Sequence, residues 1–236
     1  MIFVAEMYGV QTDQLAGLLG ATERRASALV RRWQAAGWAQ AAVLGPGPRW
    51  VWLTRDGLIR CGLPYTSGVP GLSRLAHLRA VTAVRLALAA VPQFAAGAGH
   101  WRSERSVRAS IGGAAGLRGH VPDGQLLWPG GTLVAWAGEC WAIEAELTPK
   151  TLARTVSIMR DLLTRTGDYG CRPAEVLVPG ADALHSRAIY LCAPPARPVV
   201  ARARDSLGGL GGQVEIRLLP DGALTPPAPA APRAGT

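Results

Sequence analysis

The sequence predicts an α+β chain of two domains, in which a small helical module with a hairpin precedes an α/β core built in the order αβββαβ. Three observations predict this class. Helical spacing and then two strand-like runs open the chain, strand-like runs flank an amphipathic helix in its second half, and a Pro/Gly-rich stretch separates the two parts. The expected boundaries are 1–62 for the first domain, 63–99 for a linker and connecting helix, 100–219 for the core, and 220–236 for a disordered Pro/Ala-rich tail.

The charge balance points to a polyanionic partner. The 236 residues include 25 basic and 16 acidic side chains, which gives a net charge of +9. Such a surplus suits nucleic acid, through phosphate contacts and counterion release, but it also fits a protein that is merely basic. Lys150 is the only lysine, and the arginine excess is what GC-rich coding sequence produces, so the number of arginines need not be functional.

The cysteines and the apolar runs indicate a soluble cytoplasmic protein. The four cysteines are widely spaced and form no CxxC or Cys/His pair: Cys61, Cys140, Cys171 and Cys192. With no secretory signal in view, we expect reduced thiols and no zinc site. The longest apolar stretch, Ala80–Val91, is too short to span a membrane and is interrupted by Arg85, so no membrane partner is expected.

The first domain reads as helix, helix, hairpin and short helix. A first helix ends near Leu19, and Thr22 caps a second helix that runs to about Ala36. The elements expected after it are strands over Trp38–Leu44 and Arg49–Thr54, joined by Gly45–Pro48, and a helix over Arg55–Arg60.

This order resembles a winged helix-turn-helix domain, in which the second helix of the motif enters the major groove and the hairpin wing lies against the DNA backbone. The resemblance implies DNA contacts from polar residues of the second helix and the wing, namely Arg24, Arg25, Ser27, Arg31, Arg32 and Arg49. Two alternatives stay open: a small helical domain whose arginines are only a solvated face, and a winged domain that pairs with another protein.

The second domain is expected to alternate strands and helices. A connecting helix over Ser73–Ala90 precedes it, and His100–Arg105 opens a short helix with Ser103 as its cap. The later elements are strands over Gln125–Trp128, Thr132–Trp136 and Cys140–Leu147, a helix over Thr151–Arg165, strands over Ala174–Val178 and Ala188–Cys192, a helix over Val199–Leu207, and an edge strand over Val214–Leu218.

Two acids on one strand of this domain are the most informative pattern. Strand side chains alternate, so Glu144 and Glu146 project to one side while Ile143, Ala145 and Leu147 project to the core. Two carboxylates on one face of an apolar strand are unfavourable unless a positive group neutralises them.

A third acid and the lone lysine complete the candidate site. Asp123 lies near the start of a neighbouring strand, and Lys150 follows the strand that carries Glu144 and Glu146. Three convergent carboxylates suit Mg²⁺ or Mn²⁺, which would polarise a phosphate and activate water for phosphodiester hydrolysis. Lys150 would orient that water or stabilise charge that develops on the phosphate.

A helix with Glu, then Pro-Asp, then a strand with paired acids, then a helix, resembles the PD-(D/E)xK restriction-endonuclease-like fold. The resemblance implies that Asp123 and Glu144 bind metal and that Glu104 is the acid of the first core helix. The pattern usually has lysine where this chain has Glu146. Either Glu146 serves there, as in some restriction endonucleases, or Lys150 replaces the displaced lysine.

The whole chain, from about Thr12 to Leu219, resembles the actinobacterial replication-relaxation family. The motifs that carry the resemblance are Trp-x-Ser-Glu-Arg (Trp101–Arg105), His-Val-Pro-Asp-Gly (His120–Gly124) and Ile-Glu-Ala-Glu-Leu-Thr-x-Lys (Ile143–Lys150). The resemblance implies a role in plasmid or mobile-element replication and DNA relaxation, with double-stranded plasmid DNA as partner and other replication or transfer proteins as candidate partners.

Three functions therefore remain in competition. The first is a metal-dependent nuclease or nicking factor, with Glu104, Asp123, Glu144, Glu146 and Lys150 as catalytic residues and Asp123, Glu144 and Glu146 as metal ligands. The second is a non-catalytic DNA-binding factor that keeps the nuclease-like fold as a scaffold. The third is a transcriptional regulator with an effector-binding second domain, which explains the paired glutamates and Lys150 least well. The oligomeric state stays open.

Overall fold

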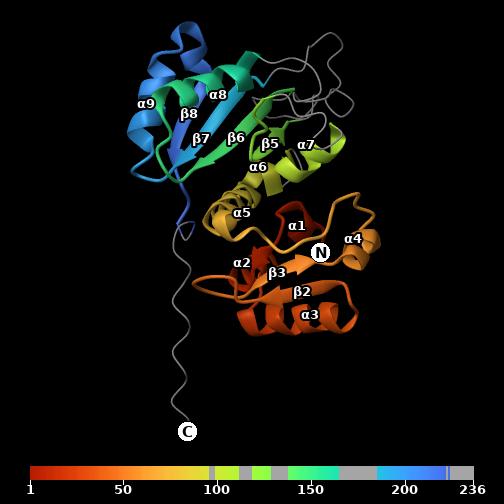
Figure 1. The fold of residues 1–236 in the computed structure, drawn as a ribbon. Helices are drawn as coiled ribbons and strands as arrows, with labels where there is room; N and C mark the ends of the chain where they lie inside the picture. Colours follow the sequence, from red (N-terminus) through yellow and green to blue (C-terminus); the bar gives the residue numbers. More distant parts are fainter. Residues whose placement is uncertain (96–98, 112–118, 129–137, 165–184, 222, 224–236) are drawn as a thin grey trace. The chain divides into compact units, whose positions relative to one another are not determined.

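The computed structural model describes residues 1–95, 99–111, 119–128, 138–164, 185–221 and 223 (Figure 1). Contacts divide the chain into two compact units: unit 1 is Met1–Leu86 with Asp221–Thr236, and unit 2 is Ala87–Pro220. The expected strands over Thr132–Trp136 and Ala174–Val178 and most of the expected tail lie outside the described residues. Within the described ranges, no helix is long and apolar enough to cross a membrane.

Both units mix helices and strands, as the sequence predicts. The described part of unit 1 contains helices and a small three-stranded antiparallel sheet, and that of unit 2 contains a five-stranded mixed sheet with helices. The elements of unit 1 are α1 (Ile2–Glu6), β1 (Val10–Gln11), α2 (Thr12–Leu18), α3 (Glu23–Ala35), β2 (Ala39–Ala42), β3 (Trp50–Leu53), α4 (Arg55–Arg60), the 3₁₀ turn η1 (Leu72–Arg74) and most of α5 (Leu75–Ala89).

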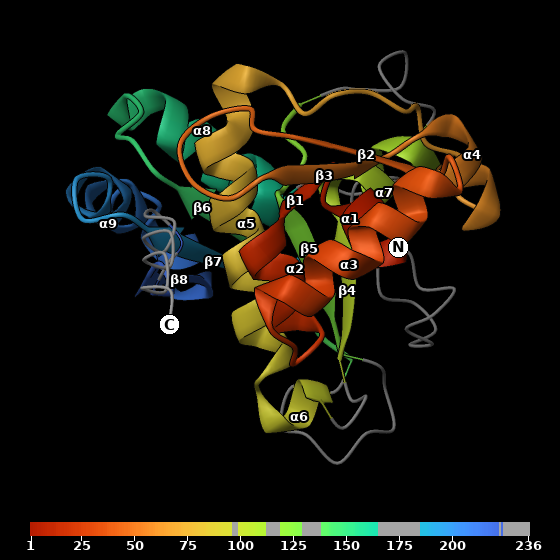
Figure 2. The same ribbon diagram turned by 90° about the horizontal axis from the view of Figure 1, so that it is seen from below.

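The second helix of unit 1, α3, begins where the sequence predicts. The Thr22 side chain accepts a hydrogen bond from the Arg25 backbone N–H at 3.4 Å, which caps the helix. Ala26, Val30 and Trp33 form its buried stripe, and α3 packs against α2 (Figure 2). The start of the helix after the Thr22 cap is therefore confirmed.

The sheet of unit 1 has the order β1-β3-β2, so β3 is the central strand. All four residues of β3 are buried. Trp50 and Trp52 form a core cluster with Leu78 of α5. The large apolar side chains of the hairpin therefore hold α5 against the sheet, and burial of this apolar area stabilises the unit.

A buried polar network joins α5, the start of α2 and the hairpin loop. The Arg79 guanidinium, in a residue only 6% exposed, pairs with Asp13 (Nη2 to Oδ2, 2.9 Å) and also donates to the Gln11 side chain. Gln11 in turn donates from Nε2 to the backbone carbonyls of Pro48, at 3.1 Å, and Pro46. The hairpin loop is thus tied to a buried ion pair.

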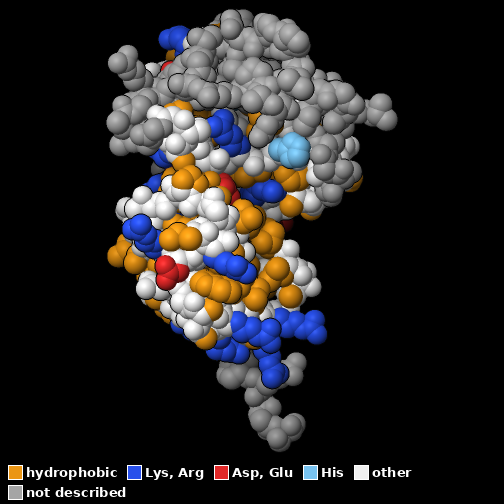
Figure 3. All heavy atoms as spheres, turned by 90° about the vertical axis from the view of Figure 1, so that its right-hand side faces the viewer, with side chains coloured by type: hydrophobic (Ala, Val, Ile, Leu, Met, Phe, Trp, Pro, Cys, Tyr) orange, Lys and Arg blue, Asp and Glu red, His pale blue; other side chains and the backbone are white. Residues whose placement is uncertain are grey.

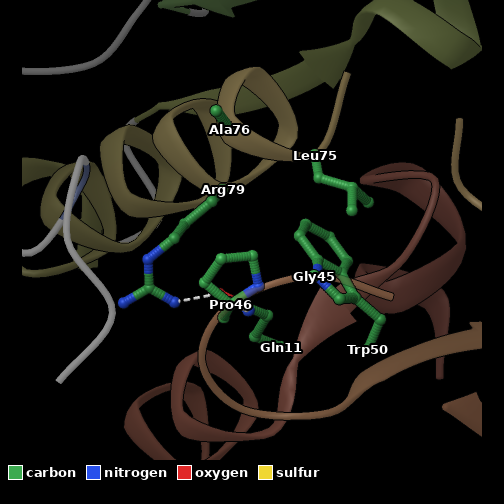
Figure 4. A pocket seen from close by; sticks show the side chains of 7 residues that line it. All are labelled: Gln11, Gly45, Pro46, Trp50, Leu75, Ala76 and Arg79. Atoms are coloured by element: carbon green, nitrogen blue, oxygen red, sulfur yellow. Dashed lines mark hydrogen bonds between the residues drawn. The ribbon is translucent and has the colours of Figure 1, made fainter. Parts of the chain in front are cut away.

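A cavity of about 160 Å³ lies beside this network. Figure 4 shows its lining, formed by Gln11, Gly45, Pro46, Trp50, Leu75, Ala76 and Arg79. Arg79 and Gln11 come together at one side of the cavity, where the hydrogen bond between them is drawn. Both of these polar side chains are already paired within the network.

The elements of unit 2 are α6 (Pro92–Ala95), β4 (His100–Ser103), α7 (Glu104–Ser110), β5 (Gly124–Leu127), β6 (Cys140–Glu146), α8 (Leu152–Thr164), β7 (Arg187–Cys192), α9 (Arg197–Asp205), the 3₁₀ segment η3 (Gly208–Gln213) and β8 (Val214–Leu218). The sheet order is β4-β5-β6-β7-β8. The pairs β4–β5 and β5–β6 are antiparallel, whereas β6–β7 and β7–β8 are parallel.

The expected helix over His100–Arg105 is partly wrong. His100–Ser103 is strand β4, because its backbone pairs with β5, with Trp101 opposite Leu126. Ser103 does cap the helix that follows, since its Oγ accepts from the Ser106 N–H at 3.1 Å. A strand therefore precedes the first core helix, and the described elements do not begin in the order αβββαβ.

Helices α8 and α9 cover one face of the parallel part of the sheet (Figure 1). Met159 of α8 and Val200 of α9 pack in one cluster with Ala142 of β6 and Ala188 and Tyr190 of β7. This face of β6 is therefore inside the core and not at the surface.

The expectation of reduced thiols throughout is wrong at one position. Cys61 and Cys192 are free, but Cys140, the first residue of β6, is disulfide-bonded. Disulfide pairing depends on the distance between two residues in space, which sequence spacing alone does not reveal.

We expect Asp13→Ala to lower the free energy of unfolding of unit 1 by about 3 kcal/mol, because it leaves the buried Arg79 guanidinium without its carboxylate. Amide hydrogen exchange in α3 and β3 measures the stability of unit 1 separately. Asp56→Ala, which removes an exposed carboxylate, is the matched control and should change it by less than about 0.5 kcal/mol. Equal effects of the two substitutions would show that the ion pair is not a major contributor.

Candidate functional site

Strand pairing brings the acids of unit 2 to one end of the sheet. Asp123 directly precedes β5, and Gly124 lies opposite Ile143 in the antiparallel pair β5–β6. Asp123 Oδ2 accepts a hydrogen bond from the Ala145 N–H at 2.8 Å, so its carboxyl group lies beside the residues that carry Glu144 and Glu146. This end also receives the carboxyl ends of β4, β6 and β7, where ligands commonly bind in α/β sheets.

A close packing contact determines the backbone next to Asp123. A Cβ atom added to Gly124 would lie 2.1 Å from the indole ring of Trp101. Only glycine lets β4 and β5 approach so closely while Trp101 covers the strand. The glycine of Pro122-Asp123-Gly124 is thus required by packing, and not only by a turn.

The two glutamates of β6 are buried, with Glu144 3% exposed and Glu146 5% exposed. They share the face of Ala142, which α8 and α9 cover. Ile143 and Ala145 on the opposite face, which the sequence predicts to face the core, are buried too. The central position of β6 explains this, since both faces of a central strand can be covered.

His120 is the partner of Glu144. Its Nε2 lies 2.8 Å from Glu144 Oε1, and its backbone N–H donates to Asp161 Oδ2 of α8 at 3.0 Å. The sequence placed His120 in the same short motif as Asp123 but did not single it out as a site residue. Its position three residues before Asp123 was the available signal.

Burial and the attraction between the two charges shift the pKa of each partner in opposite directions. Burial raises the pKa of Glu144, as does the nearby charge of Asp123, while His120 and Lys150 act in the other direction. Burial alone would lower the pKa of His120, but attraction and hydrogen bonding to Glu144, with the charge of Asp123, outweigh it, and the pKa of His120 is raised. The protonated imidazole therefore stabilises the fold below about pH 6.5, and this contribution is lost as the pH rises through the raised pKa.

Lys150 neutralises the second buried glutamate. Its Nζ donates to Glu146 Oε2, which joins the loop after β6 back to the end of that strand. A buried carboxylate without such a partner would be strongly destabilising. In this arrangement the only lysine of the chain serves as the counter-charge of Glu146.

Glu104 joins the site through its backbone. Its N–H donates to the Asp123 carbonyl at 3.2 Å, which ties the start of α7 to the Pro-Asp segment. Its side chain accepts from Arg108 Nε at 2.7 Å, one turn along α7. The structure thus places Glu104 next to Asp123 along the backbone and pairs its carboxylate with Arg108.

The donor atoms of this site suit a divalent cation, but each acid already has a protein partner. Asp123 accepts from a backbone N–H, Glu144 pairs with His120, and Glu146 pairs with Lys150. Within the described ranges, no group of three or more His, Cys, Asp or Glu side chains is arranged to hold a metal ion. A cation would have to take the place of His120 or Lys150 as the counter-charge of the glutamates.

The predicted DNA-contacting residues lie in unit 1. The arginines of α3 and the hairpin are exposed and Ser27 is half-buried, the full set being Arg24, Arg25, Ser27, Arg31, Arg32 and Arg49. Lys and Arg side chains gather at the lower end of unit 1 in Figure 3, the end at which α3 lies in Figure 1. Arg49 also donates from Nη2 to the Ala41 carbonyl at 3.0 Å, across the hairpin.

Comparison of the chain with protein-family models, with curated proteins and with solved structures gives no match. The family resemblance therefore rests on the sequence motifs alone and stays a prediction. A function has to be inferred from the two sets of residues just described.

Glu144→Gln should lower the pKa of His120, because burial and Lys150, which both lower it, are then opposed chiefly by Asp123. Titration of the imidazole ¹⁵N resonances measures this pKa directly. Glu139→Gln is the matched control, since Glu139 pairs with Trp141 and Arg187 just before β6 begins and should leave His120 unaffected. An unchanged His120 pKa in Glu144→Gln would contradict the pairing.

Proposed function

We propose that the chain is a DNA-binding protein whose unit 1 is a winged helix-turn-helix domain. The observation that carries the proposal is the exposed arginine face of α3, on a helix that packs against α2 and is followed by the β2–β3 hairpin. Phosphate contacts from such a face supply sequence-independent affinity, and base contacts from the same helix supply specificity. The competing interpretation is that these arginines only contact solvent, and that role would not require so many positive charges on one helix.

The spacing of the arginines along α3 suits the major groove of DNA. Arg24 and Arg31 are seven residues apart, as are Arg25 and Arg32, so each pair lies on one side of the helix. Two turns correspond to roughly 10 Å along the axis, and the major groove of B-DNA is about 12 Å wide. One end of α3 can therefore meet base edges while the other meets phosphates.

The hairpin supports the proposal as a pre-organised wing. Gln11 holds the loop at Pro46 and Pro48, and Arg79 holds Gln11 (Figure 4). A wing held in place before binding loses less conformational entropy on DNA than a free loop would. Arg49, whose Nη2 donates to the Ala41 carbonyl across the hairpin, would contact the DNA backbone with its remaining donors.

The sequence motifs suggest the biological setting. By resemblance to the replication-relaxation family, we propose double-stranded plasmid or mobile-element DNA as the partner, in replication or DNA relaxation. Among the described residues, no site distinguishes one duplex from another, so this setting rests on the sequence motifs.

Arg24→Ala combined with Arg25→Ala should weaken duplex binding and reduce the slope of log K against log salt by about 2, as expected for two lost phosphate contacts. A fluorescence-anisotropy titration over a series of salt concentrations measures both quantities. Arg202→Ala with Arg217→Ala removes the same charge from exposed positions of unit 2 and serves as control. Equal losses of duplex affinity in the two double variants would show that only the net charge matters, and would refute a specific role for α3.

We propose phosphodiester hydrolysis in unit 2 as a second function. The observation that favours it is the convergence of Asp123 and Glu144 at one end of the sheet, with a raised Glu144 pKa that a cation would reverse. Asp123 and Glu144 would hold Mg²⁺ or Mn²⁺, and such an ion, when bound, polarises a phosphate and activates water. His120 would give up its place beside Glu144 to the ion, and Lys150, which stays next to Glu146, would face a phosphate oxygen with its remaining donors.

Purified protein with Mg²⁺ or Mn²⁺ should nick or linearise supercoiled plasmid, and EDTA should abolish this activity. Asp123→Ala and Glu144→Ala should each reduce it to background, because each removes a proposed metal ligand, while Glu139→Gln should retain it. Gel electrophoresis of the plasmid forms over time is the measurement. Intact plasmid under all conditions, with DNA binding preserved, would favour the alternative of a non-catalytic DNA-binding factor with a nuclease-like scaffold.

A further inference from the structure

One buried side chain near the acids has an unused hydrogen-bonding group. Tyr190 of β7 lies opposite Glu144 in the parallel pair β6–β7, so the two side chains emerge side by side on one face of the sheet. The residue is 1% exposed, and its hydroxyl has no hydrogen-bond partner among the described residues. Buried hydroxyl groups are rarely left in this state, so the group calls for an occupant that accepts its proton.

The surroundings of this hydroxyl are acidic. Burial raises the pKa of Tyr190 well above its ordinary value, and the charges of Glu144, Glu146 and Asp123 raise it further. The phenol therefore keeps its proton and is available as a hydrogen-bond donor, with no acceptor among the described residues. The hydrogen bonds of these carboxylates go instead to His120, to Lys150 and to the Ala145 N–H.

The charge of the cluster determines which occupant fits. The three carboxylates outnumber their two counter-charges, His120 and Lys150, so the cluster repels a phosphate or another anion and attracts a cation. Mg²⁺ and Mn²⁺ prefer carboxylate oxygens, and Mg²⁺ in particular keeps several of its water ligands when bound. A water molecule carried by such an ion offers an oxygen that can accept the phenolic proton.

The counter-charge of Glu144, His120, is placed so that an ion can replace it. The side chains of His120 and Lys150 are 29% and 28% exposed, whereas those of Glu144 and Glu146 are 4% and 7% exposed. The imidazole can therefore turn toward solvent while Glu144 stays in place, and Lys150 remains the counter-charge of Glu146. This exchange would open the cluster to a cation without unfolding the strand.

We propose that Tyr190 is a positioning residue of a divalent-cation site: its hydroxyl donates a hydrogen bond to a water ligand of an ion held by Asp123 and Glu144. The proposal rests on the second proposed function, whose metal site it deepens, and is independent of DNA binding by unit 1. It assigns Tyr190 to the orientation of the ion's water shell and not to direct contact with substrate.

Tyr190→Phe tests the proposal without activity as the readout. Isothermal titration with Mn²⁺ should show about 2- to 10-fold weaker binding than in the wild type, the equivalent of one neutral hydrogen bond. The melting temperature in EDTA should be unchanged or higher, because the metal-free protein loses no hydrogen bond. Tyr65→Phe is the matched control: its hydroxyl donates to Glu6 in unit 1, so it should lower the melting temperature and leave Mn²⁺ binding unchanged.

The outcomes separate the two proposals. Equal Mn²⁺ affinity of wild type and Tyr190→Phe overturns the role of Tyr190 while the metal site stands. A lower melting temperature of Tyr190→Phe than of wild type in EDTA also overturns it, because the hydroxyl then has a partner without metal. A wild type that binds no Mn²⁺ at millimolar concentration overturns both the metal site and this inference. Weaker Mn²⁺ binding with an undiminished metal-free melting temperature supports the assignment.

Discussion

Strand β6 pairs antiparallel with β5 on one side and parallel with β7 on the other, and this central position forces its two glutamates into the interior of unit 2. Buried carboxylates are tolerated only where cations or hydrogen-bond donors meet them, so the surrounding groups follow from that constraint. His120 and Lys150 supply the positive charge. The same strand pairing places Asp123 and Tyr190 beside Glu144. A metal ion would compete for a charge balance that already exists.

Unit 1 also buries a charged side chain, in this case a positive one. Its buried cation is Arg79, which Asp13 neutralises and which Gln11 connects to the hairpin loop. The network gives a polar, directional link between α5 and the loop, where apolar packing by Trp50 and Leu78 would give only proximity. The two functional proposals therefore depend on separate features: DNA binding on the surface of unit 1, and cation binding in the interior of unit 2.

Much of the local structure could be predicted from the sequence, because it depends on interactions between residues a few positions apart. Caps at Thr22 and Ser103, the buried stripe of α3 and the shared face of Glu144 and Glu146 all follow from spacing along one element. The sequence suggests that Asp123 could join these acids, but it also predicts a further strand, Thr132–Trp136, between the two, so only the structure decided the direct β5–β6 pairing. The exposure of these acids does not follow, because alternation identifies which residues share a face but not whether helices cover that face.

What the sequence by itself determined is the set of local elements and the chemistry that they carry: capped helices, an arginine-rich helical face and carboxylates at alternating strand positions. Only the tertiary structure decided that His100–Ser103 is a strand, that Glu144 is buried and paired with His120, and that Tyr190 lies beside it. The physical reason is the range of the interactions. The strand pairs β4–β5 and β6–β7 and the His120–Glu144 pair join residues separated by about 20 to 50 positions, and no pattern within one element specifies such a partner.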